Sequence, residues 1–262
     1  MYHHNPPIAR QAALIAQILD FAQVPNILLG WLALGLVQHN MGIPEIEFVI
    51  PDEYAEVAIH AIEISPVPLC VKTDCHELQV QRRDETLGSA TSRLDAYHAV
   101  GFAHFHLNPF TASGLKGAEL ITLYRQSEIL PWVPRLTRSD NVGTIDSPNL
   151  TVSTDLNLPA AVDRGPSGPW VGLYPVRILT PCAFIESVMR LLGRDTLVNS
   201  ELVHTWHIFM ELIRYPTSVE KRFTDPAVEV AWVWYICRDN VGGDGLTKIM
   251  ELGKGFDESG RY

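Results

Sequence analysis

The sequence has few charged residues and few cysteines, and it lacks the common catalytic motifs. Asp, Glu, Lys and Arg make up 19% of the 262 residues, whereas hydrophobic residues make up 47%. This composition supplies enough apolar surface to bury a large core, and it argues against disorder over most of the chain. There is no G-x-S-x-G elbow, Walker loop, H-E-x-x-H or G-x-G-x-x-G. The usual hydrolase, P-loop, zincin and Rossmann sites are therefore not expected.

The four cysteines give no recognisable framework. Only Cys70 and Cys75 lie near one another, with four residues between them, and no second pair stands at zinc-site spacing. We therefore expect buried, reduced thiols. No run is long enough to span a bilayer, and no segment at the start has the order of a secretory signal. We expect a cytoplasmic protein without a membrane partner.

The charge is unbalanced toward acid, with a formal net charge of −10. Such a chain repels phosphate backbones and anionic lipid, so neither nucleic acid nor a membrane surface is an expected partner. A small anionic ligand held by a local cation or a metal is compatible with this charge. We therefore expect a small-molecule substrate.

Helical and strand-like spacings of apolar residues alternate along the chain. They predict helices at 8–21, 31–37, 53–64, 181–192, 201–213 and 227–237, and strands at 27–30, 45–50, 77–82, 103–107, 119–124, 150–153 and 175–179. Asp52 is placed to cap the third helix. The pattern indicates an α/β (α+β) fold with a mixed sheet flanked by helices. We expect a core over 1–136, a long surface excursion or lid over 137–175, and a C-terminal strand and helical lobe over 176–262.

The most informative pattern is a glycine turn followed by a strand with alternating acids. Gly30 ends a short apolar strand, and the helix after it offers a positive N-terminus. Glu45 and Glu47 stand at alternate positions of the next strand, so both carboxylates share one face. Such a pair can hold a divalent cation, Mg²⁺ or Mn²⁺, that in turn binds a triphosphate. The alternative is that the two acids only make a surface strand soluble.

The order of strand, glycine turn, helix and acid-x-acid strand resembles the nucleotidyltransferase fold superfamily. More closely, the chain is similar to a fungal family of uncharacterised proteins with that fold. The matching blocks are ILLGWLAL at 27–34, IEFVIPDE at 46–53, HFHL at 104–107, ITLYRQSEILPWVP at 121–134 and FIESVMRLLGRD at 184–195. The resemblance implies a metal-binding α/β core with a C-terminal helical lobe, and it leaves the substrate open.

The chain departs from the superfamily pattern at three points. Trp31 follows the glycine where a Gly or Ser is usual, and Glu45 and Glu47 stand where Asp is usual. A third carboxylate is expected on a neighbouring strand, and Glu119 is the nearest candidate. Within the shared blocks, Gly30, Trp31 and Ser127 are the residues that we expect to contact a bound nucleotide. The longer Glu side chain shifts a bound cation, and phosphoryl transfer is sensitive to such shifts.

A second candidate site is the pair His104 and His106. Alternate strand positions direct both imidazoles to one face, and Glu47 would complete a two-His, one-carboxylate set suited to iron, or a zinc site. The alternative is that both histidines are hydrogen-bonded structural residues.

Three functional hypotheses follow from these patterns. The first is metal-dependent transfer of a nucleotidyl group to a small molecule through Glu45 and Glu47. The second is a non-haem iron or other metal enzyme of specialised metabolism that uses His104 and His106. The third is a non-catalytic relative that binds a partner, or a further copy of itself, through the Trp-rich segment at 227–237.

Overall fold

The computed structural model describes residues 7–38, 45–65, 70, 101–107, 120–136, 147–163, 165–197, 202–214, 223, 225–237, 247 and 249–251. The predicted strand at 77–82 and the candidate ligand Glu119 lie outside these residues. The chain divides into two compact units. The first consists of Met1–Cys70, Gly101–Phe184 and Thr217–Glu220, and the second of Val71–Val100, Ile185–Pro216 and Lys221–Tyr262.

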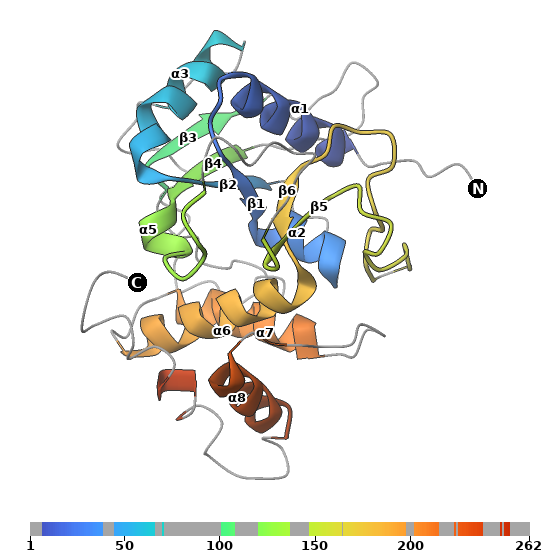
Figure 1. The fold of residues 1–262 in the computed structure, drawn as a ribbon, viewed down its shortest axis with the longest axis vertical. Helices are drawn as coiled ribbons and strands as arrows, with labels where there is room; N and C mark the ends of the chain where they lie inside the picture. The colour runs from blue at the N-terminus through green and yellow to red at the C-terminus, as the bar shows by residue number, and fades with distance from the viewer. Residues whose placement is uncertain are drawn as a thin grey trace, which may run out of the picture. The chain divides into compact units, whose positions relative to one another are not determined.

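A mixed sheet forms the centre of the first unit (Figure 1). Its described strands are β1 (Ile27–Leu29), β2 (Glu45–Ile50), β3 (Ala103–His106), β4 (Leu120–Arg125), β5 (Leu150–Val152) and β6 (Arg177–Leu179). They lie in the order β3-β4-β2-β1-β6-β5. β1 pairs with β6 and β2 with β4 in parallel, whereas β1/β2, β3/β4 and β5/β6 are antiparallel. The expected mixed sheet with flanking helices is confirmed.

The helices of the first unit are α1 (Pro7–Phe21), α2 (Gly30–Val37), α3 (Ala55–Ile64) and the short α5 (Gln126–Ile129). α1 and α3 pack against one another, side by side in Figure 1. The buried positions of α1 are mostly alanine, which lets neighbouring elements approach closely. α2 is apolar all round and buried along its whole length, as expected for a helix inside a core.

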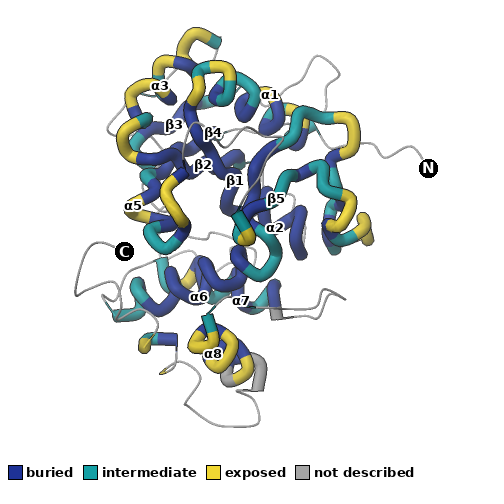
Figure 2. The backbone as a smooth tube through the Cα atoms, viewed as in Figure 1, coloured by how far each residue is buried: buried dark blue, intermediate teal, exposed yellow. Residues whose placement is uncertain are grey.

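The two faces of the sheet differ because side chains alternate along each strand. One face is mostly apolar, and five of its side chains have no exposed area: Ile46, Phe48, Phe105, Ile121 and Leu123. On the same three strands, β2, β3 and β4, the opposite face carries the polar residues Glu45, Glu47, His104, His106 and Thr122. Figure 2 shows these strands as mainly buried. Their apolar face anchors the strands, and their polar face presents the candidate functional residues.

A buried ion pair fixes the end of α1 to β6. Asp20 Oδ1 accepts hydrogen bonds of 2.8 Å from Arg177 Nη1 and 2.9 Å from Asn26 Nδ2. Its Oδ2 accepts a 2.8 Å bond from the hydroxyl of Tyr174. The side chains of Arg177 and Asp20 are only 6% and 13% exposed. Because the charge of Arg177 is buried, this network depends on the Asp20 carboxylate.

The second unit is helical among its described residues. α6 (Pro181–Leu197) begins in the first unit and continues into the second, which also contains α7 (Val203–Arg214) and α8 (Pro226–Cys237). Within it, Arg190 donates to Glu186 at 2.9 Å and to Asp225 at 2.6 Å. On α8, Trp232 and Tyr235 are 4% and 2% exposed, so both pack inside this unit.

Two local expectations are wrong. α6 continues through Gly193, where the sequence predicts a break, because buried residues such as Leu191, Leu192 and Asp195 hold the helix on both sides of the glycine. Asp52 begins a 3₁₀ turn, η1 (Asp52–Tyr54), without capping it. Its Oδ1 instead accepts a 3.4 Å hydrogen bond from the backbone N–H of Ser127.

Among the described helices, none combines the length and the apolar character that crossing a membrane would require.

Candidate functional site

The polar residues of the sheet form a row across three strands. Glu47 of β2 is in register with Thr122 of β4, and Thr122 is in register with His104 of β3. On its other side Glu47 is in register with Leu29, the last residue of β1. Residues in register on adjacent strands point to the same face. The row therefore extends from the Gly30 turn to the edge strand β3.

Glu47 is directed at the Gly30 turn. Its Oε2 accepts a 3.2 Å hydrogen bond from the backbone N–H of Trp31, in the first turn of α2. Gly30 has a φ of +68°, and a Cβ added there would lie 1.5 Å from Oε2 of Glu47. Only glycine fits this position, because the carboxylate fills the space of a side chain and the backbone is left-handed. The carboxylate thus lies where the partial positive charge of the helix N-terminus is strongest.

Tyr124 holds the second oxygen of this carboxylate. Its hydroxyl donates a 2.9 Å hydrogen bond to Oε1 of Glu47. Burial raises the pKa of Tyr124 well above its ordinary value, and the negative charges of Glu47 and Glu45 add to this effect. The phenol therefore remains protonated and continues to donate. Tyr124 was not predicted as a site residue, although it lies within one of the blocks that carry the resemblance to the fungal family, residues 121–134.

Glu45 shares the face of Glu47 but is more accessible. It is the first residue of β2 and is partly exposed, whereas Glu47 is 7% exposed. The neighbouring positions on β4, where a third carboxylate would stand, are Leu120 and Thr122. Within the described ranges, no other Asp, Glu, His or Cys joins these two acids at ligand spacing. The structure therefore gives two carboxylates with unequal exposure.

The other two residues expected at a nucleotide site lie differently. Trp31 is 3% exposed and meets Glu47 through its backbone N–H. Ser127 is exposed at the beginning of α5, next to Asp52. Asp52 follows β2, so Ser127 lies beyond the end of β2 that is opposite Glu45. The rise of a strand separates it from Glu47 by roughly 10 Å or more. The structure does not bring Ser127 to the acid pair.

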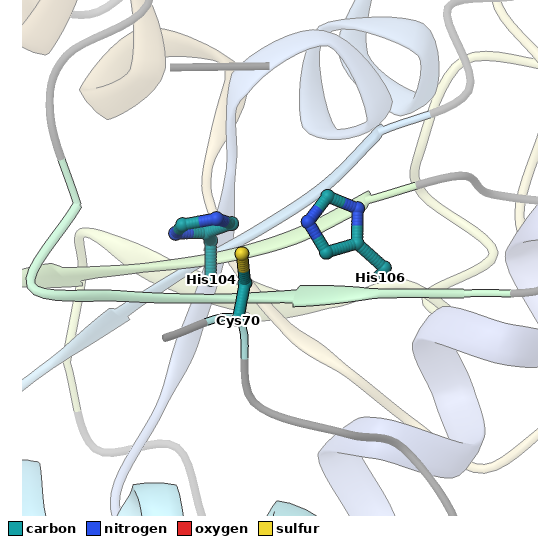
Figure 3. A group of neighbouring side chains, drawn as sticks. All are labelled: Cys70, His104 and His106. Atoms are coloured by element: carbon teal, nitrogen blue, oxygen red, sulfur yellow. The ribbon is translucent and has the colours of Figure 1, made fainter. Parts of the chain in front are cut away.

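His104 and His106 come together with Cys70 rather than with Glu47 (Figure 3). One potential ligand atom from each of Cys70, His104 and His106 lies within 4.8 Å of the others. The imidazole rings are 5.4 Å apart, with 81° between their planes. Glu47 stands two strands away, roughly 10 Å at the usual spacing of strands. The set of two histidines and Glu47 is therefore not assembled.

In the sequence, Cys70 stands out only as a thiol near Cys75. In the fold, its backbone N–H donates a 3.0 Å hydrogen bond to the carbonyl oxygen of His104. The local sequence around Cys70 does not predict this hydrogen bond, because the bond links segments that are far apart along the chain. The neighbouring Cys75 lies outside the described residues.

Comparison of the chain with models of protein families, with curated proteins and with solved structures finds no match. The function is therefore inferred from the geometry of the polar face, and the resemblance to a fungal family with a nucleotidyltransferase-like fold stays a prediction.

Proposed function

We propose that the chain is a metal-dependent transferase with a nucleotidyltransferase-like core, which transfers a nucleotidyl group to a small molecule. The observation that supports this proposal is the position of the Glu47 carboxylate, which lies against the Gly30 turn and the first turn of α2. A helix N-terminus after a glycine turn can bind a phosphate group, and carboxylates beside it can hold the Mg²⁺ that accompanies a triphosphate.

The donor chemistry of this site suits magnesium or manganese. Both ions prefer oxygen ligands, and Mg²⁺ is commonly held by one or two carboxylates together with the phosphates of its substrate. Glu45 and Glu47 would hold the ion, since they are two residues apart on one strand and share a face. When bound, the ion neutralises phosphate charge and polarises the reacting phosphorus.

The chain supplies the phosphate contacts. Gly30 lets the backbone approach a phosphate closely, and the Trp31 N–H is the donor that a phosphate oxygen would take over from Glu47. Glu47 must then turn from this N–H toward the cation. Tyr124 remains in contact with the other oxygen of Glu47 and limits how far the carboxylate moves.

In the reaction, the oxygen of an acceptor hydroxyl forms a bond to the α-phosphorus of a nucleoside triphosphate. The bond from that phosphorus to the bridging oxygen breaks, and pyrophosphate leaves with the electron pair. The hydroxyl proton passes to Glu45, which is the more exposed carboxylate of the pair. Because the net charge is −10, binding of the triphosphate depends on the cation.

Thermal unfolding with nucleotides tests this proposal. The protein is melted with ATP, GTP, CTP and UTP, each with and without Mg²⁺. We expect at least one nucleotide to raise the melting temperature only when Mg²⁺ is present. At a ligand concentration about 100 times Kd, binding stabilises a protein by about 2.7 kcal/mol, which such a measurement resolves.

Two Glu→Gln variants complete the experiment. Glu47→Gln should abolish the nucleotide-dependent shift, because the ligand charge is lost while the shape is kept. Glu63→Gln is the matched control, since Glu63 is exposed on α3. The proposal is abandoned if no nucleotide shifts the melting curve, or if Glu47→Gln responds as the wild type does.

The third hypothesis, a non-catalytic relative, receives less support. Its interface was expected through the Trp-rich segment, but Trp232 and Tyr235 are buried within the second unit. A stable oligomer that responds to neither metal nor nucleotide would favour it.

A further inference from the structure

The strongest remaining feature is the cluster of Cys70, His104 and His106 at the edge of the sheet. β3 is the outermost described strand on its side, and β4 covers only one of its two edges. At the other edge the backbone N–H of Cys70 donates to the carbonyl oxygen of His104 at 3.0 Å. This hydrogen bond holds the Cys70 backbone beside β3. The closeness of the thiol to the histidines therefore follows from the position of the backbone as well as from the orientation of the Cys70 side chain.

The strand itself directs both imidazoles to the side of the thiol. Phe105, which lies between the two histidines in sequence, has no exposed area and is anchored in the apolar core. Alternation then places His104 and His106 on the opposite face. Figure 3 shows the sulfur of Cys70 directed between the two rings, with all three side chains on one side of β3.

The spacing of the ligand atoms is close to that of a metal site. The three atoms lie within 4.8 Å of one another. In a tetrahedral zinc site with Zn–S near 2.3 Å and Zn–N near 2.0–2.1 Å, neighbouring ligand atoms are roughly 3.3–3.8 Å apart. Side-chain rotations that shorten the longest separation by roughly 1 Å therefore suffice to close the site around an ion.

The donor set selects the class of metal. One thiolate and two imidazoles suit zinc and other borderline or soft transition ions, whereas magnesium and calcium require oxygen ligands. We propose that Cys70, His104 and His106 bind Zn²⁺ through three protein ligands and leave a fourth position for water or a small ligand. Three protein ligands with one open position are characteristic of catalytic rather than structural zinc sites.

The exposure of the three residues agrees with an open fourth position. His104 is 7% exposed and forms the inner side of the cluster. Cys70 and His106 are both of intermediate exposure, so the outer side of the cluster is reachable from solvent. Glu45 and Glu47 contribute nothing to this site, because they are not part of the cluster. The zinc proposal is therefore independent of the proposed nucleotidyl transfer, and either proposal can fail without the other.

Cobalt substitution is the first test. The full-length protein is freed of metal and titrated with Co²⁺, which replaces zinc in tetrahedral sites and reports a thiolate ligand by a charge-transfer band. We expect one equivalent to produce this band and zinc to remove it. Cys70→Ser should lack the band, whereas Cys182→Ser, which removes another described thiol, should keep it. Absence of the band in wild type, or its persistence in Cys70→Ser, overturns the proposal.

The second test concerns the imidazole ligands, and it uses His106, which is more exposed than His104. His106→Ala should lower the affinity for zinc by at least tenfold in a competition titration with a chelator of known affinity. His60→Ala is the control, since His60 is an exposed histidine on α3. Circular dichroism of each variant shows whether it is folded. Equal zinc affinity in folded His106→Ala and His60→Ala would contradict the assignment of His106.

A measurement on the wild type avoids dependence on any variant. Alkylation of Cys70 by iodoacetamide is followed by mass spectrometry of its peptide, in the presence and absence of one equivalent of zinc. We expect zinc to slow this alkylation at least tenfold. An unchanged rate rejects the zinc site. Protection by copper but not by zinc would likewise reject zinc as the ion, since a Cys–His₂ set also suits copper.

Discussion

The hydroxyl of Tyr124 donates a 2.9 Å hydrogen bond to a carboxylate oxygen of Glu47, which is 77 positions earlier in the chain. The two residues lie on the parallel neighbours β4 and β2, and the other oxygen of Glu47 holds the first turn of α2. One buried carboxylate therefore joins two strands and a helix. Its removal affects stability as well as any binding function.

Tyr124→Phe should lower the free energy of unfolding by about 1.5–3 kcal/mol, the usual contribution of a hydrogen bond to a charged group. Urea denaturation measures this change. In a double-mutant cycle with Glu47→Gln, the two effects should be non-additive, because the residues are in direct contact. Additive effects would show that the hydrogen bond contributes nothing to stability.

Gly30→Ala should cost about 3 kcal/mol or more, because it adds a strained left-handed residue and displaces the Glu47 carboxylate. Gly172→Ala is the matched control: its φ is +78°, but a Cβ there meets nothing within 4 Å. We expect this control to cost only the backbone term, about 1–2 kcal/mol. Equal losses in the two variants would mean that Glu47 does not need the space above Gly30.

Asp20→Ala should lower the free energy of unfolding by about 3–5 kcal/mol, since it leaves the guanidinium of Arg177 buried without its counter-charge. Glu53→Ala removes the carboxylate from the exposed pair with Arg135, whose side chains are 38% and 70% exposed. That loss should be at most about 1 kcal/mol. Similar losses of unfolding free energy in Asp20→Ala and Glu53→Ala would contradict the expectation that a buried ion pair contributes more than an exposed one.

Alkaline unfolding tests the Tyr174–Asp20 contact. Burial and the hydrogen bond to Asp20 raise the pKa of Tyr174 to about 12, from an ordinary value of 10.0. Between pH 10 and 12 the unfolded chain therefore loses this proton while the folded chain keeps it, so the free energy of unfolding falls with rising pH in this window. Tyr174→Phe should show a shallower fall than wild type. Identical slopes in wild type and Tyr174→Phe would exclude a raised pKa for Tyr174 in the folded protein.

The sequence predicted the centre of the fold well, because local patterns determine it. β2 begins and ends where the alternation of Glu45 to Ile50 predicts, and Glu47 meets the Gly30 turn as expected for acids on that face. These features depend on residues close together in sequence, or on a single adjacent strand pair. The same reasoning placed His104 and His106 on one face.

The parts that sequence analysis missed depend on distant contacts. Cys70 joins the histidines through a hydrogen bond to β3, away from its described neighbour β4, and no local periodicity encodes such a pairing. The continuation of α6 through Gly193 has a similar cause. Glycine costs a helix about 1 kcal/mol, and buried side chains on both sides of it outweigh this cost. Tyr124 was not predicted as a site residue, because the sequence does not distinguish a tyrosine that only packs in the core from one whose hydroxyl hydrogen-bonds to a buried group.

The anchoring of Phe105 means that the hydrophobic interior and the two imidazoles cannot vary independently. A smaller residue at this position would leave a void under the strand, and the backbone would settle toward it. Such a shift would change the distances from both rings to the thiol without altering any of the three proposed ligands. A substitution in the apolar core would thereby weaken the proposed zinc site at the edge of the sheet.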